Sequence, residues 1–307
     1  MINKLVLAGG TGFIGHILMD YFKDKANEIL ILNRQRQGKE GIVEWIKWDG
    51  RTAGEWVKKM EGTDLLVNLC GKNVNCRYTE KNKKAIFSSR LEPTELLGTV
   101  INTLSQPPKL WIQAASATIY RHAEDHPQDE AGGEKGSGFS VDVCKTWESL
   151  FWKQQTPHTR KVVLRIALVM GRSDGVIPRL KNMVLAGLGG KQGSGNQYIF
   201  WVHQQDLARI IEWLYDHPAA SGTYNVSAPE AVQNHQFMKI MRQAIGVPFG
   251  LPSPQWLLEL GAKIIGTETE LILKSRWVYP KRLLEEGFTF QYPKAAPAIR
   301  EILSTRT

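Results

Sequence analysis

The sequence has few cysteines and no long hydrophobic run. Its three cysteines are an odd number without C-x-x-C spacing, and they stand at Cys70, Cys76 and Cys144. We therefore expect free thiols in a reducing compartment. No apolar stretch approaches the roughly 20 residues that span a bilayer. Met1–Lys4 leads directly into the first expected strand, which leaves no length for a signal peptide. These absences favour a cytoplasmic protein without a membrane partner.

The sequence also lacks metal-ligand spacing and a concentrated basic patch. No cluster of histidine, cysteine and acidic residues is spaced like a set of metal ligands, so we expect no bound metal. The formal net charge is +9, but the basic residues are scattered. The densest cluster, Lys81–Lys84, lies on an expected helix whose charged side chains would face solvent. We expect no nucleic-acid partner, and we assign part of the positive charge to an anionic cofactor or substrate.

A glycine motif near the N-terminus is the most informative stretch. The strand-like run Leu5–Ala8 leads into Gly9-Gly10-Thr11-Gly12-Phe13-Ile14-Gly15, and a helical pattern follows. Gly9 and Gly12 would let the backbone turn tightly and approach a pyrophosphate, while Gly15 would let the helix pack close to the strand. The helix N-terminus would present free N–H groups to the phosphates. Because strand, glycines and helix come in this order, the motif predicts a dinucleotide site rather than an ordinary turn.

Strands and helices alternate along the first half of the chain. The runs that read as strands are Lys4–Ala8, Glu28–Leu32, Val43–Trp48, Leu65–Leu69, Leu110–Ala114 and Val162–Val169. Helical patterns separate most of them, notably Arg90–Leu104 and Cys144–Lys153. This order predicts an α/β fold with a doubly wound parallel sheet that helices cover on both faces.

The regular alternation of strands and helices ends after Gly171. Glycine-rich stretches follow, and Tyr198–Val202 and Thr223–Val226 read as two more strands that flank a helix at Leu207–Tyr215. From Asn234 onward the pattern is helical and interrupted by prolines. We expect this part of the chain to be mostly helical.

The end of the second expected strand indicates which dinucleotide binds. An acid there bonds the ribose 2′-hydroxyl of NAD, whereas a basic residue accommodates the 2′-phosphate of NADP. The strand ends in Asn33-Arg34, with Arg36 close behind and no acidic residue. Since Arg34 can form charge-assisted bonds to a phosphate, we predict NADP(H) with Asn33 and Arg34 at its adenosine end. Asp49 is a candidate for the adenine amino group, or else a turn residue before Gly50.

Several stretches together resemble an extended short-chain dehydrogenase/reductase. They are Gly9–Gly15, Val67–Gly71, Ala115–Tyr120 and Trp201–Leu207. The finer resemblance is to an atypical subfamily within the NAD-dependent epimerase/dehydratase family, which has its own C-terminal domain of unknown function. The residues that carry it are Arg77–Thr79, Ser89-Arg90, Gly187–Gly190, Gly193–Gly195, Asn225–Pro229 and Pro280–Leu283. The resemblance covers essentially the whole chain.

This resemblance implies a Rossmann fold with a small, mostly helical C-terminal substrate lobe. It implies a cofactor domain at residues 1–171, to which 198–229 return, and a lobe formed by 172–197 and 230–307. It also implies that Leu69-Cys70-Gly71, at the end of a strand, contacts the cofactor. Arg90 is counted with these cofactor residues, although its charge could equally serve an acidic substrate or a salt bridge.

The chemistry of the resembled superfamily needs a serine, a tyrosine and a lysine four residues after the tyrosine. The tyrosine exchanges a proton with the substrate, the lysine lowers the tyrosine pKa and holds the nicotinamide ribose, and the serine orients the substrate. Ser116 and Lys145 match the serine and the lysine, but Val141 stands at the tyrosine position and cannot transfer a proton. Tyr120 is a candidate replacement, with a packing role as the alternative.

The sequence therefore predicts an NADP(H)-binding oxidoreductase or nucleotide-sugar-type epimerase with a non-standard acid/base. Its substrate is an unknown small molecule, and the protein is a monomer or a homodimer. The alternative is a regulatory or scaffold protein that binds NADP(H) and has lost turnover. Val141 favours the alternative, whereas Ser116, Lys145 and the C-terminal lobe favour the enzyme.

Overall fold

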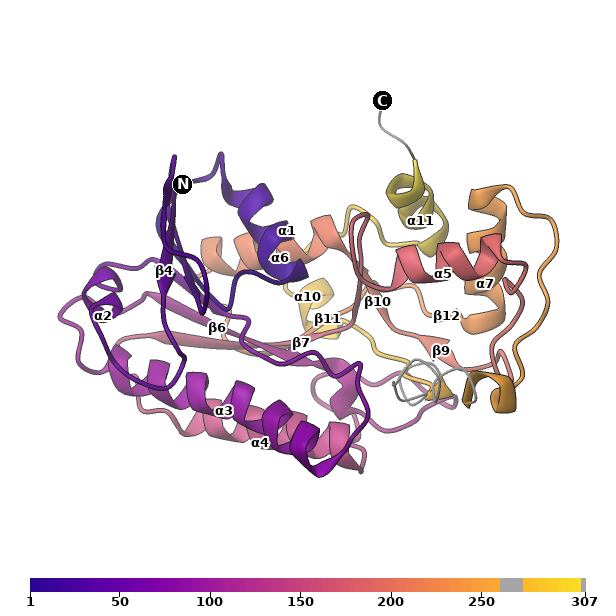
Figure 1. The fold of residues 1–307 in the computed structure, drawn as a ribbon, viewed down its shortest axis with the longest axis horizontal. Helices are drawn as coiled ribbons and strands as arrows, with labels where there is room; N and C mark the ends of the chain where they lie inside the picture. Colours follow the sequence, from indigo (N-terminus) through magenta and orange to yellow (C-terminus); the bar gives the residue numbers. More distant parts are fainter. Residues whose placement is uncertain (260–272, 305–307) are drawn as a thin grey trace.

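The computed structural model describes residues 1–259 and 273–304. Within these residues, the main sheet has eight strands in the order β11-β7-β6-β5-β1-β2-β4-β3 (Figure 1). The strands are β1 Ile2–Ala8, β2 Ala26–Asn33, β3 Gly38–Glu40, β4 Val43–Lys47, β5 Leu65–Asn68, β6 Leu110–Ser116, β7 Arg160–Ile166 and β11 Gly222–Val226. Neighbouring strands from β11 to β4 are parallel, and β3 pairs antiparallel with β4. The predicted doubly wound Rossmann sheet is confirmed.

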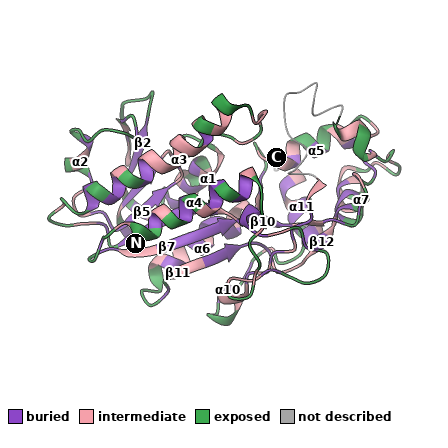
Figure 2. Cartoon of the chain, turned by 90° about the horizontal axis from the view of Figure 1, so that it is seen from below, coloured by how far each residue is buried: buried purple, intermediate pink, exposed green. Residues whose placement is uncertain are grey.

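Helices cover both faces of this sheet. Helices α1 (Phe13–Phe22) and α6 (Gln204–Asp216) lie on one face, and α3 (Glu80–Ile101) and α4 (Phe139–Lys153) lie on the other (Figure 1). A short helix, α2 (Trp56–Lys59), precedes β5. The helices therefore shield the centre of the sheet from water, and its central strands are drawn as buried in Figure 2, whereas β3 at the edge is exposed.

Strand β1 shows how the sequence builds these two cores. Leu5, Val6, Leu7 and Ala8 are all 0% exposed. Successive side chains point to opposite faces of a strand, so Leu5 and Leu7 join the core under α1 and α6, while Val6 and Ala8 join the core under α3 and α4. A continuous apolar run is what a strand buried on both faces requires.

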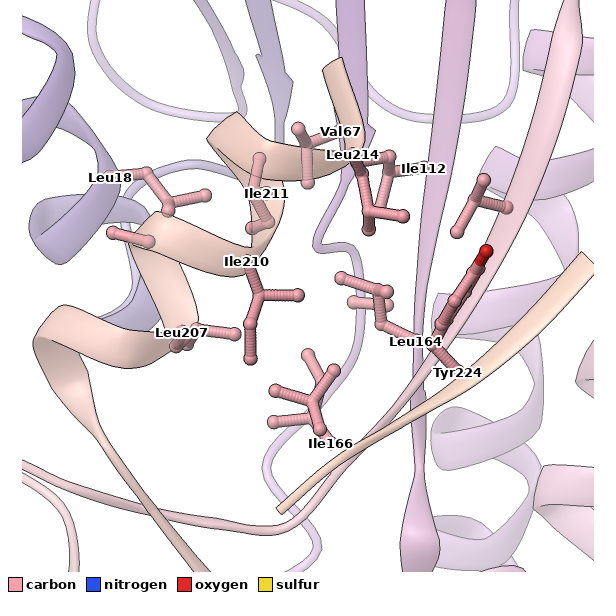
Figure 3. Packing of buried hydrophobic residues seen from close by; sticks show 14 of the residues in the cluster. Leu18, Val67, Ile112, Leu164, Ile166, Leu207, Ile210, Ile211, Leu214 and Tyr224 are labelled. Carbon is pink, nitrogen blue, oxygen red and sulfur yellow. The ribbon is translucent and has the colours of Figure 1, made fainter. Parts of the chain in front are cut away.

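The core beneath α1 and α6 is the larger of these two. In Figure 3, leucine and isoleucine side chains of the helices point onto residues of four strands. The labelled residues are Leu18, Leu207, Ile210, Ile211 and Leu214 from the helices, and Val67, Ile112, Leu164, Ile166 and Tyr224 from the strands. The second half of the chain thus contributes α6 and β11 to the N-terminal sheet.

Two expected strands are divided in the structure: Tyr198–Val202 separates into β9 (Tyr198–Ile199) and β10 (Trp201–His203), and Val162–Val169 also separates. The sequence predicts a single strand over Val162–Val169, but β7 ends at Ile166 and β8 comprises Leu168–Met170. The chain turns out of the main sheet at this point, because the amide of Leu168 donates to the carbonyl of Phe200 at 3.2 Å. Strand β8 then pairs with β10 (Trp201–His203), apart from the main sheet.

The remaining small strands also lie outside the main sheet. Strand β9 (Tyr198–Ile199) pairs antiparallel with β12 (Val232–Gln233). Of the strands within residues 198–229, only β11 joins the main sheet. The division of the chain into two domains stays a prediction, and its last segment extends into residues 260–272 and 305–307, outside the described part.

Two helices are longer than the sequence predicts: α3 joins the expected helix at Lys81–Lys84 to the pattern at Arg90–Leu104, and α4 begins before Cys144. Helix α3 starts at Glu80 because the Thr79 side chain caps it, accepting from the amide of Asn82. Helix α4 starts at Phe139. A capping hydroxyl, which is one of the groups that fix where a helix begins, marks the start of α3, whereas α4 begins after Gly138 without a side-chain cap.

The C-terminal part forms a third core of its own. Helices α5 (Val176–Leu185), α7 (Asn234–Ile245) and α11 (Ala295–Leu303) enclose it, and α10 (Lys281–Glu285) lies against β11. Asp206 on α6 ties this part to the sheet, since its carboxylate accepts the amides of Gln291 and Tyr292 at 2.8 Å. The predicted small helical C-terminal region is confirmed.

We predict that Gly15 cannot carry a side chain, whereas Gly12 can. A Cβ on Gly15 would lie 2.0 Å from the carbonyl oxygen of Gly10, while a Cβ on Gly12 would meet nothing within 4 Å. Gly15→Ala should lower the free energy of unfolding by about 2–3 kcal/mol, because backbone must move. The matched control Gly12→Ser should change it by no more than about 0.5 kcal/mol. Urea denaturation measures both, and equal losses would contradict this packing.

Candidate functional site

The two loops of the expected cofactor site meet where the strand order reverses. Strand β1 lies between β2 and β5, and in such sheets ligands bind outside the carboxyl ends of the strands at this reversal. Gly9 has a φ of +76°, and a Cβ there would lie 3.0 Å from the Sγ of Cys70. Gly9 therefore brings the β1–α1 loop directly against the β5–α3 loop.

The N-terminus of α1 is open, as a phosphate site requires. Gly12 is the N-cap residue, it is exposed, and no side chain caps the helix. The first N–H groups of a helix lack partners within the helix and attract anions. Thr11 is also exposed. The space that a Cβ on Gly12 would fill is empty, so these residues fit a dinucleotide pyrophosphate.

The other residues of the glycine motif hold the loop in place. Gly15 packs against the carbonyl of Gly10, in the loop directly after β1, so the absence of a side chain lets α1 approach the end of this strand. The Phe13 ring packs against Gly171, where an added Cβ would lie 2.4 Å from the Phe13 Cζ atom. Ile14 is half-buried and packs against the core. The side chains of Phe13 and Ile14 therefore face the protein, and what they offer a ligand is backbone.

A buried polar cluster holds the β5–α3 loop. The amide of Cys70 donates to Asn68 Oδ1 at 3.1 Å, and Asn68 Nδ2 donates to Gln113 Oε1 at 3.0 Å and to Thr94 Oγ1 at 3.2 Å. Leu69 is half-buried beside it, and Gly71 is exposed. Burial raises the pKa of the Cys70 thiol to about 12. Leu69–Gly71 thus faces, with backbone and a neutral thiol, the region outside the carboxyl ends of β1, β2 and β5, which we call the crevice.

At the end of β2, Asn33 and Arg34 have different roles. The Asn33 side chain is buried and bonded to the loop backbone, donating to Arg36 O at 2.9 Å and accepting from the amide of Gln35 at 3.0 Å. This bonding favours a positioning role for Asn33, and its contact with a cofactor stays a prediction. Arg36 pairs with Glu40 and lies over the Trp45 ring. Among the described residues, the exposed Arg34 forms no hydrogen bond or ion pair.

Asp49 takes the second of its two expected roles. Its Oδ1 accepts the amides of Thr52 and Arg51 at 2.9 and 2.8 Å, and its Oδ2 accepts the Thr52 hydroxyl at 2.8 Å. The hydrogen bonds from Thr52 and Arg51 lower the pKa of this exposed carboxyl. Asp49 closes the turn after β4, and this bonding argues against the hypothesis that it binds the adenine.

Ser116 and Lys145 stand near the carboxyl end of β6. The Ser116 hydroxyl donates to Thr118 Oγ1 at 2.9 Å, at the edge of the 3₁₀ turn Ala117–Ile119. The half-buried Lys145 ammonium donates to the carbonyl of Gly136 at 2.8 Å. Val141 lies one turn before Lys145 on α4 and is 0% exposed. This part of the helix therefore presents an apolar side chain where the resembled family has its acid.

Tyr120 occupies a structural position, which argues against the hypothesis that it replaces the acid. It is 0% exposed, and its hydroxyl lies 2.8 Å from Asn225 Oδ1 and 3.0 Å from the Asp129 carbonyl. It also accepts from Arg165 at 2.8 Å. Burial raises the pKa of Tyr120 to about 12. A hydroxyl held in this way does not reach a substrate in the crevice.

A buried ion pair underlies this arrangement. The guanidinium of Arg165 on β7 donates to both carboxylate oxygens of Glu148 on α4, each at 2.9 Å. Asn225 extends the network to the carbonyl of Tyr279 at 3.0 Å. Sequence reasoning missed Glu148. The available signal was one charge in each of two apolar patterns, Arg165 in a buried strand and Glu148 on the inner face of a helix, because buried charges require partners.

Arg90 on α3 borders the crevice from the side of β5. A Cβ on Gly71 would lie 3.1 Å from the Arg90 Cζ, and the guanidinium lies 5.1 Å from the centre of the Trp147 ring. Its Nη1 donates to the carbonyls of Ile86 and Lys72 at 3.0 and 3.1 Å. Burial lowers the pKa of Arg90. In the part of the chain that the structure describes, no carboxylate pairs with it.

Two further findings concern the described residues alone. They hold no group of three or more histidine, cysteine or acidic side chains placed to bind a metal ion. None of their helices combines the length and apolarity of a membrane span.

Two family models match the chain. The NAD dependent epimerase/dehydratase family matches residues 5–227. A domain of unknown function (DUF1731) matches residues 253–302. The first match contains both loops of the crevice together with Ser116 and Lys145, and the second contains the segment that Asn225 contacts.

Similar proteins match over nearly the full length. The epimerase family protein SDR39U1 of Bos taurus is 29% identical, over 98% of this chain and 100% of its own. The epimerase family protein YfhF of Bacillus subtilis is 28% identical over 99% of each. A crystal structure of human SDR39U1 (isoform 2) with NADPH has a TM-score of 0.86 at 28% identity, covering 97% of this chain and 98% of that one.

A second solved structure is larger than this chain. It is the nucleoside-diphosphate sugar epimerase from Corynebacterium glutamicum, with a TM-score of 0.79 at 25% identity. The match covers 99% of this chain and 58% of that one.

We predict that the Tyr120 hydroxyl stabilises the fold. Tyr120→Phe leaves Arg165 and Asn225 each without one buried partner, which should lower the free energy of unfolding by about 1–3 kcal/mol. The control is Tyr215→Phe, at a half-buried tyrosine, which should cost less than about 0.5 kcal/mol. Urea denaturation of both variants checks this. A Tyr120→Phe protein with unchanged stability and abolished turnover would instead restore Tyr120 as the acid.

Proposed function

The chain belongs to the NAD dependent epimerase/dehydratase family, and on that premise we propose that it binds NADP(H) across the crevice and uses it to oxidise or reduce a small molecule. The resemblance read from the sequence is thereby confirmed at the level of the family. Support for the cofactor comes from the open N-terminus of α1 and from the related human protein, whose structure was solved with NADPH.

The exposed Arg34 carries the choice of NADP(H) over NAD(H). It is the cation at the end of β2 that has no partner among the described residues, whereas Arg36 is engaged by Glu40 and Trp45. Asn33 fixes the loop that presents Arg34. A guanidinium in this position can bond the 2′-phosphate with two N–H groups.

Ser116 and Lys145 provide the polar groups of the reaction site in this proposal. When bound, the nicotinamide ring accepts or donates a hydride. Ser116 orients the substrate hydroxyl or carbonyl, and Lys145 holds the ribose after leaving the Gly136 carbonyl. The relative from Corynebacterium glutamicum is named as a nucleoside-diphosphate sugar epimerase, which favours nucleotide sugars as one substrate class. Residues 172–197 and 230–307 would form the substrate lobe.

Val141 favours a second candidate function. Because it is buried and cannot exchange a proton, the chain lacks the acid of the resembled family at that position. A regulator or scaffold that binds NADP(H) without turnover would not need an acid at this position. The enzyme remains our first proposal, since general acid–base catalysis contributes about 10²–10⁴-fold and its loss slows a reaction without abolishing it.

We predict that NADPH binds more tightly than NADH and that Arg34 is the reason. Arg34→Ala removes a charge-assisted contact, which should cost about 1.5–3 kcal/mol, or roughly ten-fold or more in NADPH affinity. Its NADH affinity should be unchanged. Calorimetric titration with both cofactors measures this, and Arg51→Ala, at an exposed arginine paired with Glu92, serves as the control. Equal affinities of the wild type for NADPH and NADH would contradict the proposal that Arg34 selects NADP(H).

We predict slow, Ser116-dependent turnover. The wild type should oxidise NADPH in the presence of a reactive dicarbonyl, and Ser116→Ala should lower this rate about ten-fold or more, because the substrate oxygen is no longer oriented. Its NADPH affinity should be retained. Ser149→Ala, at an exposed position of α4, is the control. Wild-type protein that binds NADPH but shows no dicarbonyl-dependent oxidation would favour the regulatory function.

A further inference from the structure

Arg90 is a half-buried cation in the crevice whose counter-charge the described chain does not provide. We propose that Arg90 binds an anionic group of the substrate, so that this site takes a small molecule bearing a carboxylate or a phosphate. The inference rests on the proposed function and adds to it the chemical class of the substrate.

The contacts of Arg90 hold the guanidinium without neutralising it. Nη1 donates to two backbone carbonyls, those of Ile86 and Lys72. The guanidinium of Arg90 lies over the Trp147 ring. It also lies close to Gly71, where a side chain would collide with it. These contacts fix its position, but carbonyl dipoles and an aromatic ring carry no net negative charge. The guanidinium therefore stays available for an anion.

A comparison within the same region shows what is missing. Arg165 is buried, and Glu148 pairs with it through two hydrogen bonds of 2.9 Å. Removing a cation from water is costly unless a partner of opposite charge compensates for it. Across residues 1–259 and 273–304, no carboxylate does so for Arg90. An anionic ligand in the crevice would compensate, and it can reach Arg90 because this side chain is only half-buried.

Arg90 lies between the β5–α3 loop and α4, the helix that also carries Lys145. Its guanidinium lies against Gly71 and over the Trp147 ring. Burial and the Glu148 carboxylate raise the pKa of the neighbouring Cys144 thiol, and Arg90, Arg276 and Arg165 oppose this shift. Glu148, the carboxylate in this group, is already bonded to Arg165. The pyrophosphate already has the N-terminus of α1, and the 2′-phosphate has Arg34.

The test separates an anion of the substrate from an anion of the cofactor. Wild type, Arg90→Gln and Arg90→Lys are titrated calorimetrically with malonate and with inorganic phosphate, each with and without saturating NADPH. The NADPH affinity of each variant is measured separately. Arg300→Gln, at an exposed position of α11, is the charge-matched control. Circular dichroism verifies that all variants are folded.

We expect the NADPH-loaded wild type to bind at least one of the two anions. Arg90→Gln should weaken that binding about ten-fold or more, the effect of losing one charge-assisted contact, while NADPH affinity stays within about three-fold. The anion affinity of Arg90→Lys should lie between those of the wild type and Arg90→Gln, because the charge remains and the planar guanidinium is lost. Arg300→Gln should behave like the wild type.

Two outcomes would overturn the inference. In one, Arg90→Gln loses NADPH affinity ten-fold or more and its anion binding is unchanged, which would assign Arg90 to the cofactor phosphates. In the other, neither anion binds the wild type, with or without NADPH. A wild type that fails to bind NADPH would reject the proposed function instead, and the titrations without NADPH would still decide the role of Arg90.

Discussion

The close approach of backbone segments around the glycine motif is the constraint on which the site depends. Gly9 lies against Cys70, and Gly15 lies against Gly10, at distances that leave no room for a side chain. These approaches bring the β1–α1 loop, the start of α1 and the β5–α3 loop together at the point where the strand order reverses. The N-terminus of α1 is left open at this point. Arg34 and Arg90 both lie close to the β5–α3 loop beside it.

A second constraint is the buried network that joins the Rossmann sheet to the C-terminal part. Glu148, Arg165, Tyr120 and Asn225 connect α4, β7, the segment after β6 and β11, and Asn225 reaches the carbonyl of Tyr279. Each polar atom of such a network is hydrogen-bonded to another, so the loss of one member leaves its partners buried without a hydrogen bond. The network therefore holds Tyr120 in the buried interior, where its hydroxyl already has several partners.

The arginines of the molecule divide according to their partners. Arg36 and Arg165 have carboxylates beside them, at Glu40 and Glu148. Arg34 and Arg90, which both lie near the β5–α3 loop, have none among the described residues. This distribution is consistent with our proposals that anionic groups of NADP(H) and of an acidic substrate complete the site. Val141, buried where the resembled family has its acid, is the residue that separates the two functions we propose.

The sequence by itself determined the parallel sheet, the glycine loop and the family, because these depend on local geometry: buried strands need continuous apolar runs, and tight turns need glycine at set spacings. Tertiary structure alone decided that Tyr120 is buried, that Glu148 neutralises Arg165, and that the expected strand at Val162–Val169 divides. Each of these depends on partners distant along the chain, such as Asn225, 105 residues from Tyr120. Local patterns show which residues are polar or apolar, but only the folded chain determines which polar groups meet and which face the crevice.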